Sequence, residues 1–95
     1  MTRLILITGA TGRFGKIFVK YFLQKGDEVI ALAKTKSNLE GLIKENKKFS
    51  EKIHLVELDL MSNQFSEKLI NILEKKNLNP SCLINNARSL NNIQI

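Results

Sequence analysis

Three glycines, spaced three residues apart, follow the first apolar segment of the chain. Residues 4–7 are uniformly apolar and predict a buried strand, and Gly9, Gly12 and Gly15 come after it. A pyrophosphate needs backbone N–H donors at close range, which side chains with a Cβ would obstruct. We expect Gly9 to make the tight turn, Gly12 to let phosphates approach, and Gly15 to let the next helix pack closely. The spacing therefore predicts a nucleotide-binding turn.

This turn must be positioned by a strand before it and a helix after it. Apolar residues recur at helical spacing in the next segment, at Phe14, Ile17, Phe18, Tyr21 and Phe22. The pattern predicts a helix that packs this face on the sheet and ends at Gly26 and Asp27. Residues 28–33 are almost uniformly apolar and predict a second buried strand. Residues 3–33 thus form one strand-helix-strand unit.

The alternation of strands and helices continues along the chain. Ser37 and Glu40 have the spacing of a capping box, which predicts a second helix over about 37–48. Residues 53–58 predict a third strand, and 82–84 a fourth. A third helix between them is marked by Phe65, Leu69, Ile72 and Leu73. We therefore expect an α/β fold, a doubly wound parallel sheet of strand order 3-2-1-4, with the first two helices on one face and the third on the other.

Three motifs, in chain order, resemble the N-terminal half of the short-chain dehydrogenase/reductase family. They are Thr8-Gly9-x-x-Gly12-x-x-Gly15 after the first strand, Asp59 after the third, and Asn85-Asn86-Ala87 after the fourth. The glycine spacing is similar to the extended and atypical branches, whereas Asn-Asn-Ala is similar to the classical branch, so both stay open. The resemblance implies that residues 1–95 are an incomplete Rossmann-type β-α-β-α-β-α-β segment that binds NAD(P), truncated before the catalytic half.

The resemblance also implies an activity for the intact protein. In the family, hydride passes between the nicotinamide and a carbonyl or alcohol carbon of a small molecule, and a tyrosine transfers the proton. The family's catalytic Ser and Tyr-x-x-x-Lys have no counterpart here, so we assign no catalytic residue and expect the chain alone to be inactive. Tyr21 and Lys25 share that spacing by coincidence, because we expect Tyr21 to pack on or near the sheet. The intact enzyme is expected to be a homo-oligomer.

Cofactor choice depends on the end of the second strand. Ala33 occupies the position where an acidic residue would bind the adenosine ribose hydroxyls. Lys34 and Lys36 follow it and Arg13 projects from the glycine turn, so three cations could surround a ribose 2′-phosphate. This favours NADP over NAD. The alternative is that these are solvated surface charges of a lysine-rich chain.

The adenine site implied by the resemblance follows the third and fourth strands. Asp59 would contact the adenine through its carboxylate and neighbouring backbone, and Leu60 would lie beside the ring. The alternative is that Asp59 caps a helix, because an aspartate is also suited to that position. Asn86 and Ala87 would line the cofactor cleft, whereas Asn85 would tie adjacent strands together through its amide.

Arg88 replaces the glycine that is usual in this motif, and it would either aid cofactor binding near the ribose phosphate or reshape the pocket. The Asn-Asn-Ala-Arg variant is similar to dehydrogenase-like proteins of bacterial flagellin and sialic-acid-type sugar modification. The complete predicted cofactor site consists of Gly9, Thr11, Gly12, Arg13, Phe14, Gly15, Lys34, Asp59, Leu60, Asn86, Ala87 and Arg88.

The remaining reactive residues favour structural roles. Cys82 lies in a predicted buried strand, and a single cysteine permits no intrachain disulfide, which fits a reducing cytoplasm. His54 is expected at the sheet edge opposite the cofactor, with no carboxylate or second ligand at metal spacing, so no metal site is predicted. No apolar run approaches the ~20 residues that span a bilayer, so no membrane partner is expected.

The charge of the chain raises an alternative function. The 95 residues include 15 Lys plus Arg and 9 Asp plus Glu, which give a net charge of +6 and would attract polyanions. Glutamates interrupt the basic residues between 34 and 52, and no aromatic residues are interleaved as a stacking platform, so nucleic acid is not the expected partner. A catalytically silent regulatory or assembly domain that keeps the nucleotide-binding fold stays open.

Overall fold

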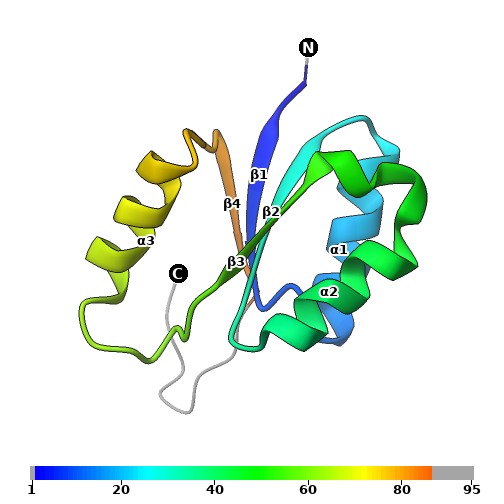
Figure 1. The fold of residues 1–95 in the computed structure, drawn as a ribbon. Coiled ribbons are helices and arrows are strands. Elements are labelled where there is room, and N and C mark those ends of the chain that lie inside the picture. Colours follow the sequence, from blue (N-terminus) through cyan, green and yellow to red (C-terminus); the bar gives the residue numbers. More distant parts are fainter. Residues whose placement is uncertain (1, 87–95) are drawn as a thin grey trace.

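The computed structural model describes residues 2–86, which form a four-stranded parallel sheet with helices on both faces (Figure 1). The elements in chain order are β1 (Leu4–Thr8), α1 (Arg13–Gln24), β2 (Glu28–Ala33), α2 (Lys36–Glu45), a 3-10 helix (Lys47–Lys52), β3 (Ile53–Glu57), α3 (Phe65–Lys75) and β4 (Cys82–Asn85). The strand order is β3-β2-β1-β4, and α1 and α2 lie on one face with α3 on the other. The predicted doubly wound α/β fold is confirmed.

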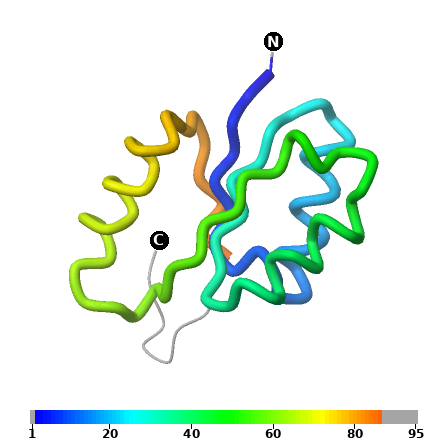
Figure 2. Tube along the Cα trace, in the orientation of Figure 1, coloured from blue at the N-terminus to red at the C-terminus, as the bar shows by residue number. Residues whose placement is uncertain are grey.

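The core is divided by the sheet into two layers because successive strand residues point to opposite faces. Ile5 and Ile7 of β1 pack in the layer beneath α1 and α2, whereas Leu6 packs in the layer beneath α3. In the parallel register, Ile5 is paired with Val29 of β2 and with Cys82 of β4. Packing in both layers fixes the positions of the strands. Because the strands are parallel, the turns after β1, β2 and β3 lie at the same edge of the sheet (Figure 2).

The second predicted helix differs from the structure at both ends. The α2 helix begins at Lys36, after Thr35, so Ser37 is inside the helix and makes no capping hydrogen bond. It ends at Glu45 because Asn46 leaves the helical conformation, with φ −123° and ψ 43°. The buried side chain of Asn46 donates a hydrogen bond of 3.0 Å to the Leu42 carbonyl and so stabilises this break. A 3-10 helix then replaces the predicted last turn.

The buried face of α1 agrees only in part with the prediction. Phe18 and Phe22 pack against the core as partly buried residues, but the fully buried residues are Gly15, Val19 and Leu23, at four-residue steps. Phe14 and Ile17 are 53% and 59% exposed. Gly15 lies against the turn after β1, where there is no room for a side chain. This contact fixes the rotation of the helix about its axis, because Val19 and Leu23 must then face the sheet.

Tyr21 lies on the exposed flank of α1 and is not one of the core residues, which differs from the prediction that it packs on or near the sheet. The residue is 51% exposed, and the Lys25 Nζ lies 5.2 Å from the centre of its ring. The two residues therefore form a surface cation–π pair one helical turn apart. The Tyr-x-x-x-Lys spacing of these two residues is therefore explained by their contact on the surface of α1.

The amino edge of the sheet contains a carboxylate that the prediction for His54 missed. His54 Nε2 lies 2.8 Å from Glu28 Oε1, because β2 and β3 are adjacent. Among residues 2–86, no group of three or more His, Cys, Asp or Glu side chains could hold a metal ion. Cys82 is partly buried and packs against the core beneath α1, as predicted, but its strand β4 contains no buried residue and so is not the buried strand that was expected. Within the same residues, none of the helices has the length and apolar character needed to cross a membrane.

Candidate functional site

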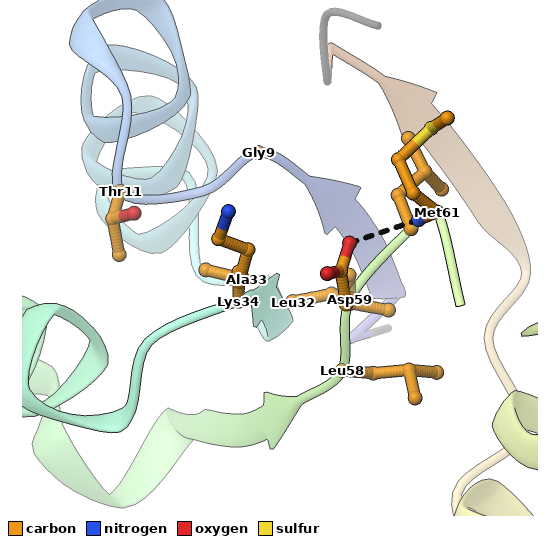
Figure 3. Close-up of a pocket in the computed structure, with 9 residues that line it drawn as sticks. Gly9, Thr11, Leu32, Ala33, Lys34, Leu58, Asp59 and Met61 are labelled. Atoms are coloured by element: carbon orange, nitrogen blue, oxygen red, sulfur yellow. Dashed lines mark hydrogen bonds between the residues drawn. The ribbon is translucent and has the colours of Figure 1, made fainter.

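A pocket lies at the carboxyl edge of the sheet, between the ends of β2 and β3 and the turn after β1 (Figure 3). It is lined by Gly9, Thr11, Leu32, Ala33, Lys34, Leu58, Asp59, Leu60 and Met61. Five of these belong to the predicted cofactor site, namely Gly9, Thr11, Lys34, Asp59 and Leu60. Parallel strands all present their carboxyl ends at this edge, so residues far apart in the sequence meet here.

The turn between β1 and α1 leaves backbone donors available to an anion. Gly9 has the positive φ of 62° that the tight turn requires, and its carbonyl accepts a hydrogen bond of 3.1 Å from the Gly12 N–H. Gly12 is the N-cap of α1, and neither a side-chain cap nor an acidic residue occupies the first turn. The first N–H groups of α1 thus have the orientation and the partial positive charge that bind phosphate in other proteins.

Gly12 and Gly15 have different surroundings in this turn. A Cβ on Gly12 would lie 3.4 Å from the Gly9 carbonyl oxygen, an ordinary contact, so the fold itself tolerates a methyl group there. A Cβ on Gly15 would collide with the same oxygen and would lie 2.8 Å from backbone atoms of Ala10. Gly15 is required for the packing of α1 on the turn, whereas the packing of the fold does not explain the glycine at position 12.

Arg13 and Phe14 begin α1 next to the turn but do not line the pocket. Both are exposed, and Phe14 is part of the apolar flank of the helix. Their side chains therefore lie beside the predicted phosphate position and outside the pocket at the β2 and β3 ends. Lys36, the third predicted cation, is the first residue of α2 and also lies outside the pocket.

Lys34 is the cation that lines the pocket. It follows Ala33 at the end of β2, is exposed to solvent, and extends its amino group toward the turn that contains Gly9 (Figure 3). Ala33 leaves this position without an acidic side chain, and its carbonyl accepts a hydrogen bond of 2.9 Å from the Leu58 N–H. The pocket therefore presents a positive charge beside the end of β2.

Asp59 organises the turn that follows β3. Its Oδ1 accepts a hydrogen bond of 2.9 Å from the Met61 N–H, and its backbone carbonyl accepts one of 2.9 Å from the Ser62 N–H. The α3 helix begins later, at Phe65 after Gln64, so Asp59 does not cap that helix. Its side chain instead makes a local Asx turn that places Leu60 and Met61 at the pocket.

Asn85 and Asn86 link the end of β4 to the end of β1. The Thr8 hydroxyl donates a hydrogen bond of 2.9 Å to Asn85 Oδ1, which agrees with the predicted role of Asn85 in joining the strands. The Asn86 N–H donates to Thr8 Oγ1 over 3.0 Å, and Asn86 Nδ2 donates to the Gly9 carbonyl over 3.2 Å. Asn86 thus contacts the glycine turn, but it is not among the residues that line the pocket. Ala87 and Arg88, also predicted at the site, lie outside the described residues.

Met61 is the pocket residue that the sequence reasoning missed most clearly. The motif drew attention to Asp59 and Leu60, and the next position carries no charge or glycine to mark it. The position of Met61 could have been predicted from the turn, because an aspartate that forms an Asx turn brings the residue two positions later close to itself.

The chain is similar to known proteins along most of its length. The family model described as short chain dehydrogenase matches residues 3–93. The chain is similar to the NADP-dependent 3-hydroxy acid dehydrogenase of Escherichia coli K12, with 30% identity over 84 residues, which cover 88% of this chain and 33% of the relative. The chain thus spans about a third of the length of the curated relatives it matches.

Solved structures show the same likeness. A 4-hydroxyisoleucine dehydrogenase complexed with NADH has 31% identity and a TM-score of 0.77, over 93% of this chain and 35% of that protein. Serine dehydrogenase from Escherichia coli has 28% identity and a TM-score of 0.76, over 90% of this chain and 38% of that protein.

Proposed function

Since the chain belongs to the short-chain dehydrogenase family, we propose that it is the NADP-binding portion of an oxidoreductase that acts on a carbonyl or alcohol group of a small molecule. The observation that carries this proposal is the pocket in which the glycine turn, Lys34 and Asp59 meet at the carboxyl edge of the sheet. The bound nicotinamide would supply or accept the hydride. This chain would contribute binding and orientation, and the proton-transfer residues would belong to polypeptide beyond it.

Each part of the dinucleotide has a candidate partner in the site. The N–H groups at the start of α1 would bind the pyrophosphate, and open space at Gly12 would admit it. The Lys34 ammonium would pair with the 2′-phosphate of the adenosine ribose. Asp59 and Leu60 would contact the adenine. The NADP dependence of the Escherichia coli relative supports this choice, and the neighbour complexed with NADH supports a nicotinamide cofactor in general.

Calorimetric titration with NADPH and NADH tests the cofactor assignment. We expect NADPH to bind more tightly, and Lys34→Ala to weaken NADPH binding by roughly tenfold while leaving NADH nearly unchanged, because only NADPH carries the 2′-phosphate. Lys36→Ala is the matched control, since Lys36 is also an exposed cation but does not line the pocket.

Three outcomes would count against the proposal. Tighter binding of NADH would contradict the NADP assignment. An equal loss of NADPH affinity in both lysine variants would mean that general surface charge attracts the ligand. A folded chain that binds neither dinucleotide would contradict a self-sufficient site and favour a catalytically silent domain.

The broader setting of the protein follows from the same proposal. A catalytic half would complete the enzyme, a small carbonyl or alcohol compound would be its substrate, and the intact protein would be a homo-oligomer. We place it in the cytoplasm because its single cysteine suits a reducing compartment.

A further inference from the structure

Met61 is an apolar residue at the mouth of the pocket that remains 60% exposed. Its backbone is held in place, because the Met61 N–H donates a hydrogen bond of 2.9 Å to Asp59 Oδ1. Its neighbours Leu58 and Leu60 also line the pocket but are partly buried. A long apolar side chain on a fixed backbone at the rim of a pocket is positioned to cover a ligand there.

The two ends of the pocket differ in chemistry. Lys34 and Met61 lie on opposite sides of Asp59 (Figure 3). One end therefore offers a positive charge, the centre a carboxylate, and the other end the thioether of Met61. One Asp59 oxygen accepts the bond from the Met61 N–H, and that carboxylate holds the turn that carries Met61. Along the pocket, a positive charge is followed by a hydrogen-bond acceptor and then by an apolar surface. This order is complementary to a phosphorylated ribose that carries a flat base.

We propose that Met61 binds the adenine ring of an adenine nucleotide, with its thioether against the ring, and so contributes to selection of the base. The proposal rests on the proposed function, because it requires an adenine nucleotide in this pocket. Sulfur–aromatic contacts are favourable and are often made at the ring edge, which suits a residue at the rim of the pocket. Lys34 then recognises the phosphate end of the ligand and Met61 the base end.

Methyl resonances of methionine give a direct test in the intact chain. The chain contains two methionines, so labelling with [methyl-13C]methionine gives two signals, and Met61→Leu identifies the one from Met61. Addition of adenosine 2′,5′-bisphosphate is expected to shift the Met61 signal through the ring current of the base. Ribose 5-phosphate, which has no ring system, is expected to leave it in place. An unmoved Met61 signal at saturating adenosine bisphosphate would overturn the inference.

Affinity measurements on variants give a second test. Met61→Ala is expected to weaken binding of adenosine 2′,5′-bisphosphate by roughly two- to tenfold, and Met61→Leu to restore most of the affinity by restoring apolar surface. Ile70→Ala is the matched control, because Ile70 is an exposed apolar residue of α3 that does not line the pocket.

The outcomes separate this inference from the proposed function. If the wild-type chain binds the bisphosphate and Met61→Ala binds it equally well, the role of Met61 is refuted and the cofactor proposal stands. If the folded wild-type chain binds neither the bisphosphate nor NADPH, both are refuted. A shift that ribose 5-phosphate also produces would indicate movement of the turn and would contradict contact with the base.

Discussion

Gly12 and Gly15 lie three residues apart in one turn, yet they are glycines for different physical reasons. A Cβ on Gly15 would collide with the Gly9 carbonyl oxygen, a backbone atom that a side-chain rotation cannot move away. A Cβ on Gly12 would meet the same oxygen at 3.4 Å, which is an ordinary contact distance. The fold requires a glycine at position 15 but tolerates a methyl group at position 12, where the proposed role is to admit a ligand, although the sequence motif treats the two alike.

Gly15→Ala is therefore expected to destabilise the chain by about 1–3 kcal/mol, the usual range for overpacking at a tight contact. Urea unfolding followed by circular dichroism would measure the change. Gly41→Ala is the matched control, because Gly41 lies in α2 and a Cβ there would project into open space. That variant is expected to stabilise by about 0.5–1 kcal/mol, since alanine is the better helix former. Equal stability of both variants would refute the collision at Gly15.

Gly12→Ala is expected to lower the free energy of unfolding by no more than about 1 kcal/mol, because the fold has room for the methyl group and alanine is only a poorer N-cap than glycine. Its effect should instead fall on the ligand, because the new methyl group points into the space that phosphates would enter. We expect NADPH affinity, measured by calorimetry, to fall by roughly tenfold or more. Undiminished affinity in this variant would show that the phosphates do not approach the turn at Gly12.

At the scale of the elements, the orientation of α1 depends on this same turn. Apolar residues surround more than half of the helix, so periodicity alone allowed Phe14, Ile17 and Tyr21 to be placed on the sheet. The structure buries Gly15, Val19 and Leu23 instead. A backbone contact at one end of the helix decides which of two adjacent apolar faces is buried, because the helix is rigid over its length.

The junction of α1 and β2 is held to β1 by an ion pair that should make stability depend on pH. Asp27 is 5% exposed and accepts hydrogen bonds from Arg3 Nη2 at 2.9 Å and from Arg3 Nε at 3.3 Å. The side-chain hydrogen bond from Arg3 lowers the pKa of Asp27 below its ordinary value. The folded state then binds fewer protons than the unfolded state, so the pair stabilises the fold above the unfolded pKa.

This contribution is expected to be lost as pH falls below about 4 and through the lower pKa of the folded state. Asp27→Asn should lower the urea midpoint at neutral pH and make that midpoint less sensitive to acid. The comparison is Glu45→Gln, which removes an exposed pair with Lys16 at 3.7 Å and should change the midpoint little. A neutral-pH midpoint unaffected by Asp27→Asn would contradict the stabilising role of the pair.

At the scale of the whole molecule, the described residues form a pocket at the carboxyl edge of the sheet. The pocket contains Lys34 and Asp59 as its charged groups, and Asp59 is already engaged by the Met61 N–H. Tyr21 and Lys25, the pair with the spacing of the family's catalytic residues, lie on the exposed flank of α1. Because the pocket lies at the carboxyl edge of the sheet, Tyr21 and Lys25 do not line it.

We expect the purified 95-residue chain to bind NADPH without oxidising it in the presence of small aldehydes or ketones. The reason is that proton transfer to the substrate oxygen needs a positioned acid, which a bound dinucleotide cannot replace. Loss of absorbance by NADPH would measure turnover. Oxidation that Gly12→Ala abolishes would contradict the expectation, because it would place catalysis in this pocket.

Strand order, and the edge at which ligand residues meet, could be predicted from the amino-acid pattern. Alternating apolar strands and helices permit few parallel topologies, and all strand ends of such a sheet lie together. Gly9, Lys34 and Asp59 could therefore be assigned to one site from their positions after successive strands.

Contacts between elements were needed to establish the rotation of α1, the break at Asn46, and the use of Asp59 to hold Met61 at the pocket. Periodicity describes each segment alone, and it gives equal weight to all apolar residues on a broad face. The actual choice depends on contacts that form only when the segments meet, such as Gly15 against the Gly9 carbonyl. The apolar periodicity of α1 allows more than one rotation of the helix on the sheet, and close packing between the elements determines which one is adopted.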